Sequence, residues 1–187
     1  MSSTALISDL HLGAGSGADV LRRPAIQDRL FEATTDIDRI VLLGDTVELR
    51  DLPLGKSLES TRGFFERLGQ AFAGREVVIV PGNHDHRLLG PWLERSREDD
   101  RPAGLDELVD APHPAVRSIA GWLGEAKLTV RYPGIWVRDD VYATHGHYLD
   151  SHVTLPTIER LSVATVDRLG GIPTGRRTTP HLSLIHI

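Results

Sequence analysis

Apolar runs alternate with segments of helical periodicity along the first half of the chain. Three runs rich in β-branched residues are typical of buried parallel strands: 5–7, 40–43 and 76–80. Two segments between them carry apolar residues at helical spacing: 20–34 and 57–73. Ser57 is positioned to cap the second of these helices. The alternation of strands and helices predicts parallel strands joined by crossover helices.

The second half has shorter predicted elements. Residues 91–112 are rich in charge and proline, which favours a short helix followed by a surface loop. Apolar spacing predicts further helices over 115–124 and 156–169. Tyr132-Pro133-Gly134 predicts a turn between the first two of three short strands: 127–132, 135–138 and 141–144. We therefore expect an α/β protein with two sheets facing each other and helices outside.

The bulk composition narrows the class of protein. A chain of 187 residues with 40% hydrophobic and 25% charged residues fits a single globular domain. The formal net charge is −5 and both signs are mixed along the chain, so no electrostatic footprint for nucleic acid is expected. There is no cysteine, so a metal ion would have to be held by oxygen and imidazole ligands.

The two ends of the chain bear on its location and on the extent of the domain. The N-terminus lacks the basic and long apolar regions of a secretory signal, and no apolar stretch reaches the ~18 residues that span a bilayer. These features predict a cytoplasmic protein without a membrane segment. The chain ends on the uncharged segment 181–187, which is unusual for a domain terminus. We expect the natural domain to continue beyond it.

Polar side chains follow the predicted strands directly. The carboxyl ends of parallel strands meet in the crevice where open α/β sheets bind ligands. Carboxylate, amide and imidazole groups from four segments come to this position: Asp9, His11, Asp45, Asn83 and His145. Such a mixed set suits Mn²⁺, Fe, Zn²⁺ or Ni²⁺. Two such ions about 3.5–4 Å apart form the arrangement that supports two-metal hydrolysis.

Individual roles follow from side-chain chemistry. Asp9 and His11 are two residues apart, so on an extended backbone their side chains point the same way. The two oxygens of the Asp45 carboxylate can bridge two cations. His84 is expected to face the substrate, where an imidazolium stabilises developing charge or protonates the leaving oxygen. Asp85 is expected to orient that imidazole.

A competing motif lies in the first loop. Gly13-Ala14-Gly15-Ser16-Gly17-Ala18 matches the dinucleotide fingerprint. In that fingerprint the turn follows the strand directly, whereas here Asp9 and His11 intervene and a carboxylate disfavours an anion. A nucleotide-binding oxidoreductase is therefore the weaker alternative. Each short metal-site motif also occurs on ordinary polar turns, and it is their order and spacing that favour the metal centre.

The series of motifs along the chain resembles that of the calcineurin-like metallophosphoesterase superfamily. The motifs are, in order, Asp-x-His, Gly-Asp-x-x-Glu, Gly-Asn-His-Asp and a later His-Gly. The resemblance covers residues 4 to about 150. It implies a four-layer αββα sandwich around a dinuclear centre, as a single domain over 1–187 that is incomplete at its C-terminus. His84 takes the place of the catalytic histidine of the family, with Asp85 as its partner.

The resemblance also implies a division of the metal ligands. Asp9 and His11 would bind the first ion. Asp45 would bridge both ions, and Asn83 and His145 would bind the second. Mn²⁺ is the first candidate, with Fe, Zn²⁺ and Ni²⁺ as the others.

Two departures from the family pattern stand out. Glu48 replaces the usual aspartate, a variant similar to the branch of UDP-2,3-diacylglucosamine pyrophosphatases, which usually carries arginine where this chain has His84. The closing Gly-His-x-His motif is also absent after residue 150. Either His145-Gly146-His147 serves instead, with Thr144 in the place of glycine, or the motif follows residue 187. We favour the second interpretation.

The implied activity is metal-dependent hydrolysis of a phosphoester or pyrophosphate bond in a small phosphorylated substrate. The bond type stays open between monoester, diester and pyrophosphate, and the oligomeric state stays open as well. The alternative function is a non-catalytic scaffold that keeps the fold for protein interaction. Retention of His84 argues against the scaffold, because such members tend to lose the catalytic histidine.

Overall fold

Parallel strands form the centre of the structure. The structure is a computed structural model, and it describes residues 3–98, 104–110 and 112–148. Four strands pair side by side in parallel: β1 (Thr4–Ile7), β2 (Arg39–Leu43), β3 (Glu76–Val80) and the first part of β5 (Lys127–Arg138). The three strands predicted at 5–7, 40–43 and 76–80 are confirmed. The chain divides into two units, Met1–His145 and Gly146–Ile187, and every element described here belongs to the first.

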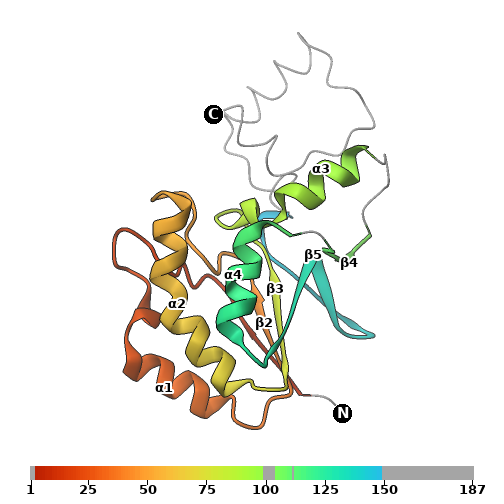
Figure 1. Cartoon of the computed structure of the whole chain (residues 1–187). Helices are drawn as coiled ribbons and strands as arrows, with labels where there is room; N and C mark the ends of the chain where they lie inside the picture. Colours follow the sequence, from red (N-terminus) through yellow and green to blue (C-terminus); the bar gives the residue numbers. More distant parts are fainter. Residues whose placement is uncertain (1–2, 99–103, 111, 149–187) are drawn as a thin grey trace, which may run out of the picture. The chain divides into compact units, whose positions relative to one another are not determined.

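Helical elements connect these strands: η1 (Val20–Arg22), α1 (Pro24–Ala33), α2 (Leu54–Ala71), η2 (His86–Leu89), α3 (Gly90–Glu98) and α4 (Pro114–Leu123). Of these, α1, α2 and α4 lie together on one side of the strands (Figure 1). Pro24 occupies the first position of α1, where a missing backbone N–H is harmless, and separates it from η1. The predicted helices are confirmed within the described residues, and the one predicted over 156–169 lies outside them.

The predicted cap of α2 is wrong. The helix already begins at Leu54, and Ser57 is buried inside it. The N–H groups of Lys56 and Ser57 both donate to the carbonyl oxygen of Pro53, at 2.8 and 3.2 Å. Because the helix begins directly after Pro53, Ser57 lies within its first turn and cannot occupy the N-cap position.

The predicted turn at Tyr132-Pro133-Gly134 is also wrong. β5 continues through these residues as one strand of 12 residues. Beyond its parallel part it pairs antiparallel with β4 (Asp106–Leu108) and β6 (Val141–Thr144). Proline and glycine are local turn signals, but pairing with these two strands keeps the backbone extended. β4 lies in the region predicted as a surface loop and was not expected.

The hydrophobic core joins the parallel strands β2 and β3 to the antiparallel pair formed by the second part of β5 and β6. One buried cluster contains residues from both: Val41, Val78, Val80 and Ile135, with Leu43, Val137 and Ala143 packed against it. Alternate residues of a strand point to opposite faces. The other face of β2 and β3 is fully buried as well: Ile40, Leu42, Val77 and Ile79. The predicted α/β fold is thus confirmed. The expected pair of separate sheets is not found among the described residues, where the strands form one six-stranded sheet in the order β1-β2-β3-β5-β4, with β6 beside β5.

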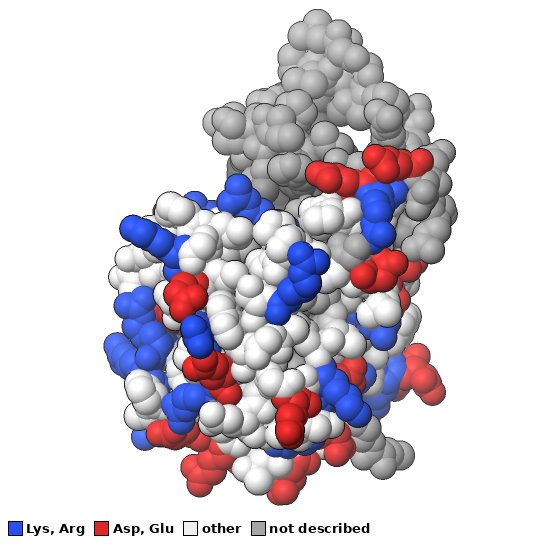
Figure 2. All heavy atoms as spheres, viewed as in Figure 1, with Lys and Arg blue, Asp and Glu red and all other residues white. Residues whose placement is uncertain are grey.

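The surface and the helices agree with the composition. Basic and acidic side chains are interspersed on the face shown in Figure 2. None of the helices in the described part of the chain has the length and apolar character that crossing a membrane requires. The cytoplasmic location and the single domain over 1–187 stay predictions.

The contact between α2 and α4 can be tested through Gly69. A Cβ at this position would lie 2.3 Å from the carbonyl oxygen of Leu123, so Gly69→Ala must push the helices apart. We expect it to lower the free energy of unfolding by about 1–3 kcal/mol. Gly63→Ala is the matched control in the same helix, because a Cβ there meets nothing within 4 Å. It should stabilise by up to ~1 kcal/mol. Equal effects of both substitutions in urea denaturation would contradict this packing.

Candidate metal centre

The loops that follow β1 and β2 run side by side past the ends of the strands. The N–H of Asp9 donates to the carbonyl oxygen of Gly44 at 3.1 Å, and the N–H of His11 donates to that of Asp45 at 2.8 Å. A parallel bridge between Leu12 and Val47 extends the pairing. Asp9, His11 and Asp45 therefore come to one edge of the sheet on a hydrogen-bonded backbone.

These three residues share an unusual backbone conformation. Asp9, His11 and Asp45 have φ angles of 56°, 44° and 49°, and among the described residues no other non-glycine residue has a positive φ. Such conformations cost on the order of 1–3 kcal/mol each and cluster at functional sites. The expectation of an extended backbone at Asp9 and His11 is therefore wrong. Their side chains still converge, because the loop hydrogen bonds hold the strained conformation.

Imidazole nitrogens surround one oxygen of Asp45. The Nε2 atoms of His11 and His145 each lie 3.8 Å from Asp45 Oδ2, and that of His84 lies 4.0 Å away. His145 Nε2 also lies 3.5 Å from Asp9 Oδ1. Two atoms that bind one ion at roughly 2.0–2.2 Å are themselves about 3–4 Å apart. Donor atoms of Asp9, His11 and Asp45 lie within 4.8 Å of one another, so these residues fit a metal ion.

Gly44 makes room for His145. Its φ is +79°, and a Cβ at this position would lie 2.1 Å from Cδ2 of the His145 ring. Only glycine allows both the turn and the close approach of the ring. The Gly-Asp pair therefore places the Asp45 carboxylate and accommodates His145 at the same time.

The Asn83 amide lies between Asp45 and Arg50 and has two possible orientations. With its NH₂ group toward Asp45, it donates to Oδ2 at 3.2 Å, and its oxygen accepts from Arg50 Nη1 at 3.2 Å. With its oxygen toward Asp45, two acceptors face each other, an arrangement that a cation between them would stabilise. Asn83 therefore also fits the group of ligands around Asp45.

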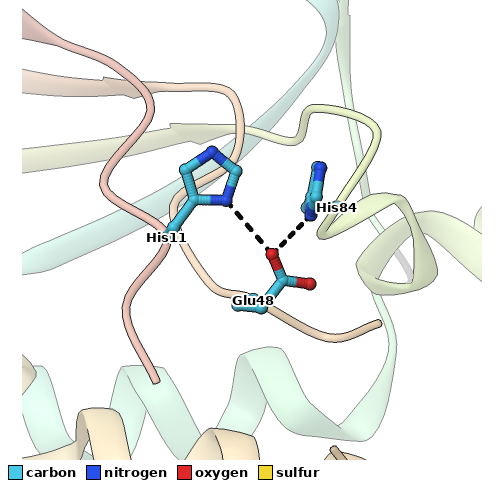
Figure 3. Close-up of side chains that lie close together, drawn as sticks. All are labelled: His11, Glu48 and His84. Atoms are coloured by element: carbon cyan, nitrogen blue, oxygen red, sulfur yellow. Dashed lines mark hydrogen bonds and ion pairs between the residues drawn. The ribbon is translucent and has the colours of Figure 1, made fainter. Parts of the chain in front are cut away.

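Glu48 joins two histidines and was not among the predicted site residues. Its carboxylate is 4% exposed, and its Oε2 accepts from Nδ1 of His11 at 3.1 Å and from Nδ1 of His84 (Figure 3). The two rings meet edge to face with centroids 4.6 Å apart. Each Nε2 is thereby left facing Asp45. The spacing Gly-Asp-x-x-Glu was the available signal, since it brings a second carboxylate to the same strand end.

The charges of two carboxylates are stabilised within the centre. A hydrogen bond with the Ser8 side chain holds the pKa of Asp9 below its usual value, and the hydrogen bond with His145 adds to this effect. Burial raises the pKa of Glu48, but hydrogen bonds from the Arg50 N–H and from the imidazoles outweigh burial and lower it. Both groups are therefore ionised at neutral pH, as metal binding and hydrogen-bond acceptance require.

Asp85 differs from its expected role. It is fully buried, and its carboxylate accepts from the N–H groups of Gly82, Thr46 and Val47 at 2.6, 2.8 and 3.3 Å. The side-chain partner of His84 is Glu48 instead. Burial raises the pKa of Asp85 to about 6, against the effect of the Gly82 hydrogen bond. Asp85 therefore ties the loop after β3 to the loop after β2.

The glycine-rich loop uses its own backbone groups. The N–H of Gly13 donates to Asp19 Oδ2 at 3.1 Å, and that of Gly17 donates to the carbonyl oxygen of Ala14 at 3.0 Å. Asp19 in turn pairs with Arg22 at 2.7 Å. These N–H groups do not converge on a common point, as a pyrophosphate site requires. The dinucleotide alternative gains no support from this geometry.

A family model described as calcineurin-like phosphoesterase matches residues 2–179. No curated protein and no solved structure matches the chain.

The structural role of Asp85 leads to a stability prediction. Asp85→Ala leaves three buried N–H groups without their acceptor, so we expect the free energy of unfolding to fall by at least about 2 kcal/mol. Asp140→Ala is the control, because among the described residues the Asp140 side chain pairs only with Arg138, at an exposed position, and its loss should change stability by less than about 1 kcal/mol. Thermal unfolding followed by circular dichroism compares the two. An Asp85 variant as stable as the control would contradict the assigned role.

Proposed function

The chain belongs to the calcineurin-like phosphoesterase family, and from this premise we propose that it hydrolyses a phosphoester or pyrophosphate bond with two divalent cations. The observation that carries the proposal is the set of donor atoms around Asp45 Oδ2, at distances that suit a shared ion. A small phosphorylated substrate fits this chemistry, because paired cations neutralise phosphoryl oxygens.

We propose that the ligands divide between two ions. Asp9 and His11 would hold one ion, Asn83 and His145 would hold the other, and Asp45 would serve both. Asp45 is suited to bridging because it is 4% exposed and faces donor groups from three other segments. Mn²⁺ is the proposed metal, since the ligands combine hard oxygens with imidazoles and contain no thiolate.

The proton chemistry is assigned to His84. Divalent cations at such a centre supply a nucleophile at neutral pH and stabilise phosphoryl charge. Nε2 of His84 faces the centre, 4.0 Å from Asp45 Oδ2, and donates a proton to the leaving oxygen. Glu48 accepts from Nδ1 of the same ring, which orients the ring so that Nε2 points toward the centre. Glu48 thus acts as a positioning residue for His84 and His11.

The bridging role of Asp45 is tested by Asp45→Asn. We expect hydrolysis of a chromogenic phosphodiester to rise with Mn²⁺ in the wild type and to fall about a hundredfold or more in the variant. Loss of an outer partner of a metal ligand already costs about 10–100-fold, and loss of the bridge should cost at least as much. Asp140→Asn, at an exposed carboxylate, is the control. Unchanged activity in Asp45→Asn would rule the mechanism out, and metal-loaded wild type without activity would favour the scaffold alternative.

The positioning role of Glu48 is tested by Glu48→Gln. This substitution keeps the size of the side chain but removes the charge that orients both imidazoles. We expect kcat to fall about 10–100-fold, while the variant still binds Mn²⁺ in elemental analysis. Glu66→Gln on the exposed face of α2 is the control. A variant with wild-type kcat would show that the contact of Glu48 with His84 is only structural.

A further inference from the structure

Arg50 places a positive charge at the edge of the metal centre. Its backbone N–H donates to Oε1 of Glu48 at 2.9 Å, which fixes the residue beside the site. Its side chain is exposed, and Nη1 lies 3.2 Å from the Asn83 amide. Within the part of the chain that the structure describes, its guanidinium forms no ion pair with a carboxylate. A cation here is unfavourable beside bound metal ions unless an anion joins them.

The Asn83 amide connects Arg50 to the metal centre. Its oxygen is the acceptor for Arg50 when its NH₂ group faces Asp45. When the oxygen turns toward Asp45 to bind a cation, the NH₂ group faces the guanidinium instead. An amide NH₂ and a guanidinium both donate and neither accepts, so that hydrogen bond is lost. Arg50 and a cation therefore compete for one oxygen atom.

We propose that Arg50 exchanges partners when the centre binds metal. Without metal it donates to the Asn83 oxygen, and with metal it binds an anionic oxygen of the substrate's phosphoryl group. The inference rests on the proposed function and adds a substrate-binding residue to it. Guanidinium groups are suited to this task because their planar donors match phosphate oxygens. The exchange makes phosphate binding depend on prior metal binding.

The exchange predicts effects of opposite sign for a single substitution. Arg50→Ala removes a competitor for the Asn83 oxygen and a repulsive charge, so calorimetric titration should show Mn²⁺ bound roughly threefold more tightly, or better. The same variant saturated with Mn²⁺ should bind inorganic phosphate roughly 10–100-fold more weakly, as expected for a lost charge-assisted hydrogen bond. Arg117→Ala, at an exposed arginine of α4, should change neither affinity.

A purely structural role of Arg50 would weaken both affinities in Arg50→Ala. Arg50→Lys provides a second variant, which keeps the charge but loses the planar donors, and its phosphate affinity should lie between wild type and Arg50→Ala. Unchanged phosphate affinity or weaker Mn²⁺ binding in Arg50→Ala overturns the exchange alone, provided that the wild type binds Mn²⁺ and hydrolyses the phosphodiester. A wild type that binds no Mn²⁺ overturns both this inference and the proposed function.

Discussion

The Asp45 carboxylate is the point on which the other groups of the centre depend. Its Oδ1 accepts from the backbone N–H of His84 at 2.8 Å, so it orders the loop after β3. Its Oδ2 faces imidazole nitrogens from the loops after β1, β3 and β6. A 4% exposed carboxylate surrounded in this way has little freedom to move. Its position follows from the end of β2, which is the central member of the first three parallel strands.

The strain at the centre is held by the rest of the fold. Three residues with positive φ would relax in an isolated loop. Here the backbone hydrogen bonds between the first two loops and the buried Asp85 carboxylate hold the loops in place. The buried β2 and β3 strands provide the rigid base beneath them. The energy that orders the site therefore comes from the core, from the backbone hydrogen bonds between the loops and from the buried Asp85 carboxylate.

Local pattern in the sequence was enough to predict the parallel strands and the candidate metal-binding residues at their ends. β-Branched runs identified the parallel strands, and polar residues at their ends converge because parallel strands end at one edge. The turn at Pro133 was mispredicted because distant partners, β4 and β6, decide the backbone there. Glu48 was missed for a similar reason, since its contacts with His11 and His84 join residues 37 and 36 positions apart. Which of two carboxylates, Glu48 or Asp85, pairs with His84 is decided by the three-dimensional packing and not by their spacing in the sequence.

The double membership of β5 has a consequence for the order of assembly. Its first part belongs to the parallel strands, and its last part carries β6, which ends at His145. His145 can reach Asp45 only after this long strand has been added beside β3, far along the chain from the first two loops. An ion bound by the first two loops and by His145 would therefore bind late in folding, after the hydrophobic core has formed. It would then stabilise the pairing of β5 with β6.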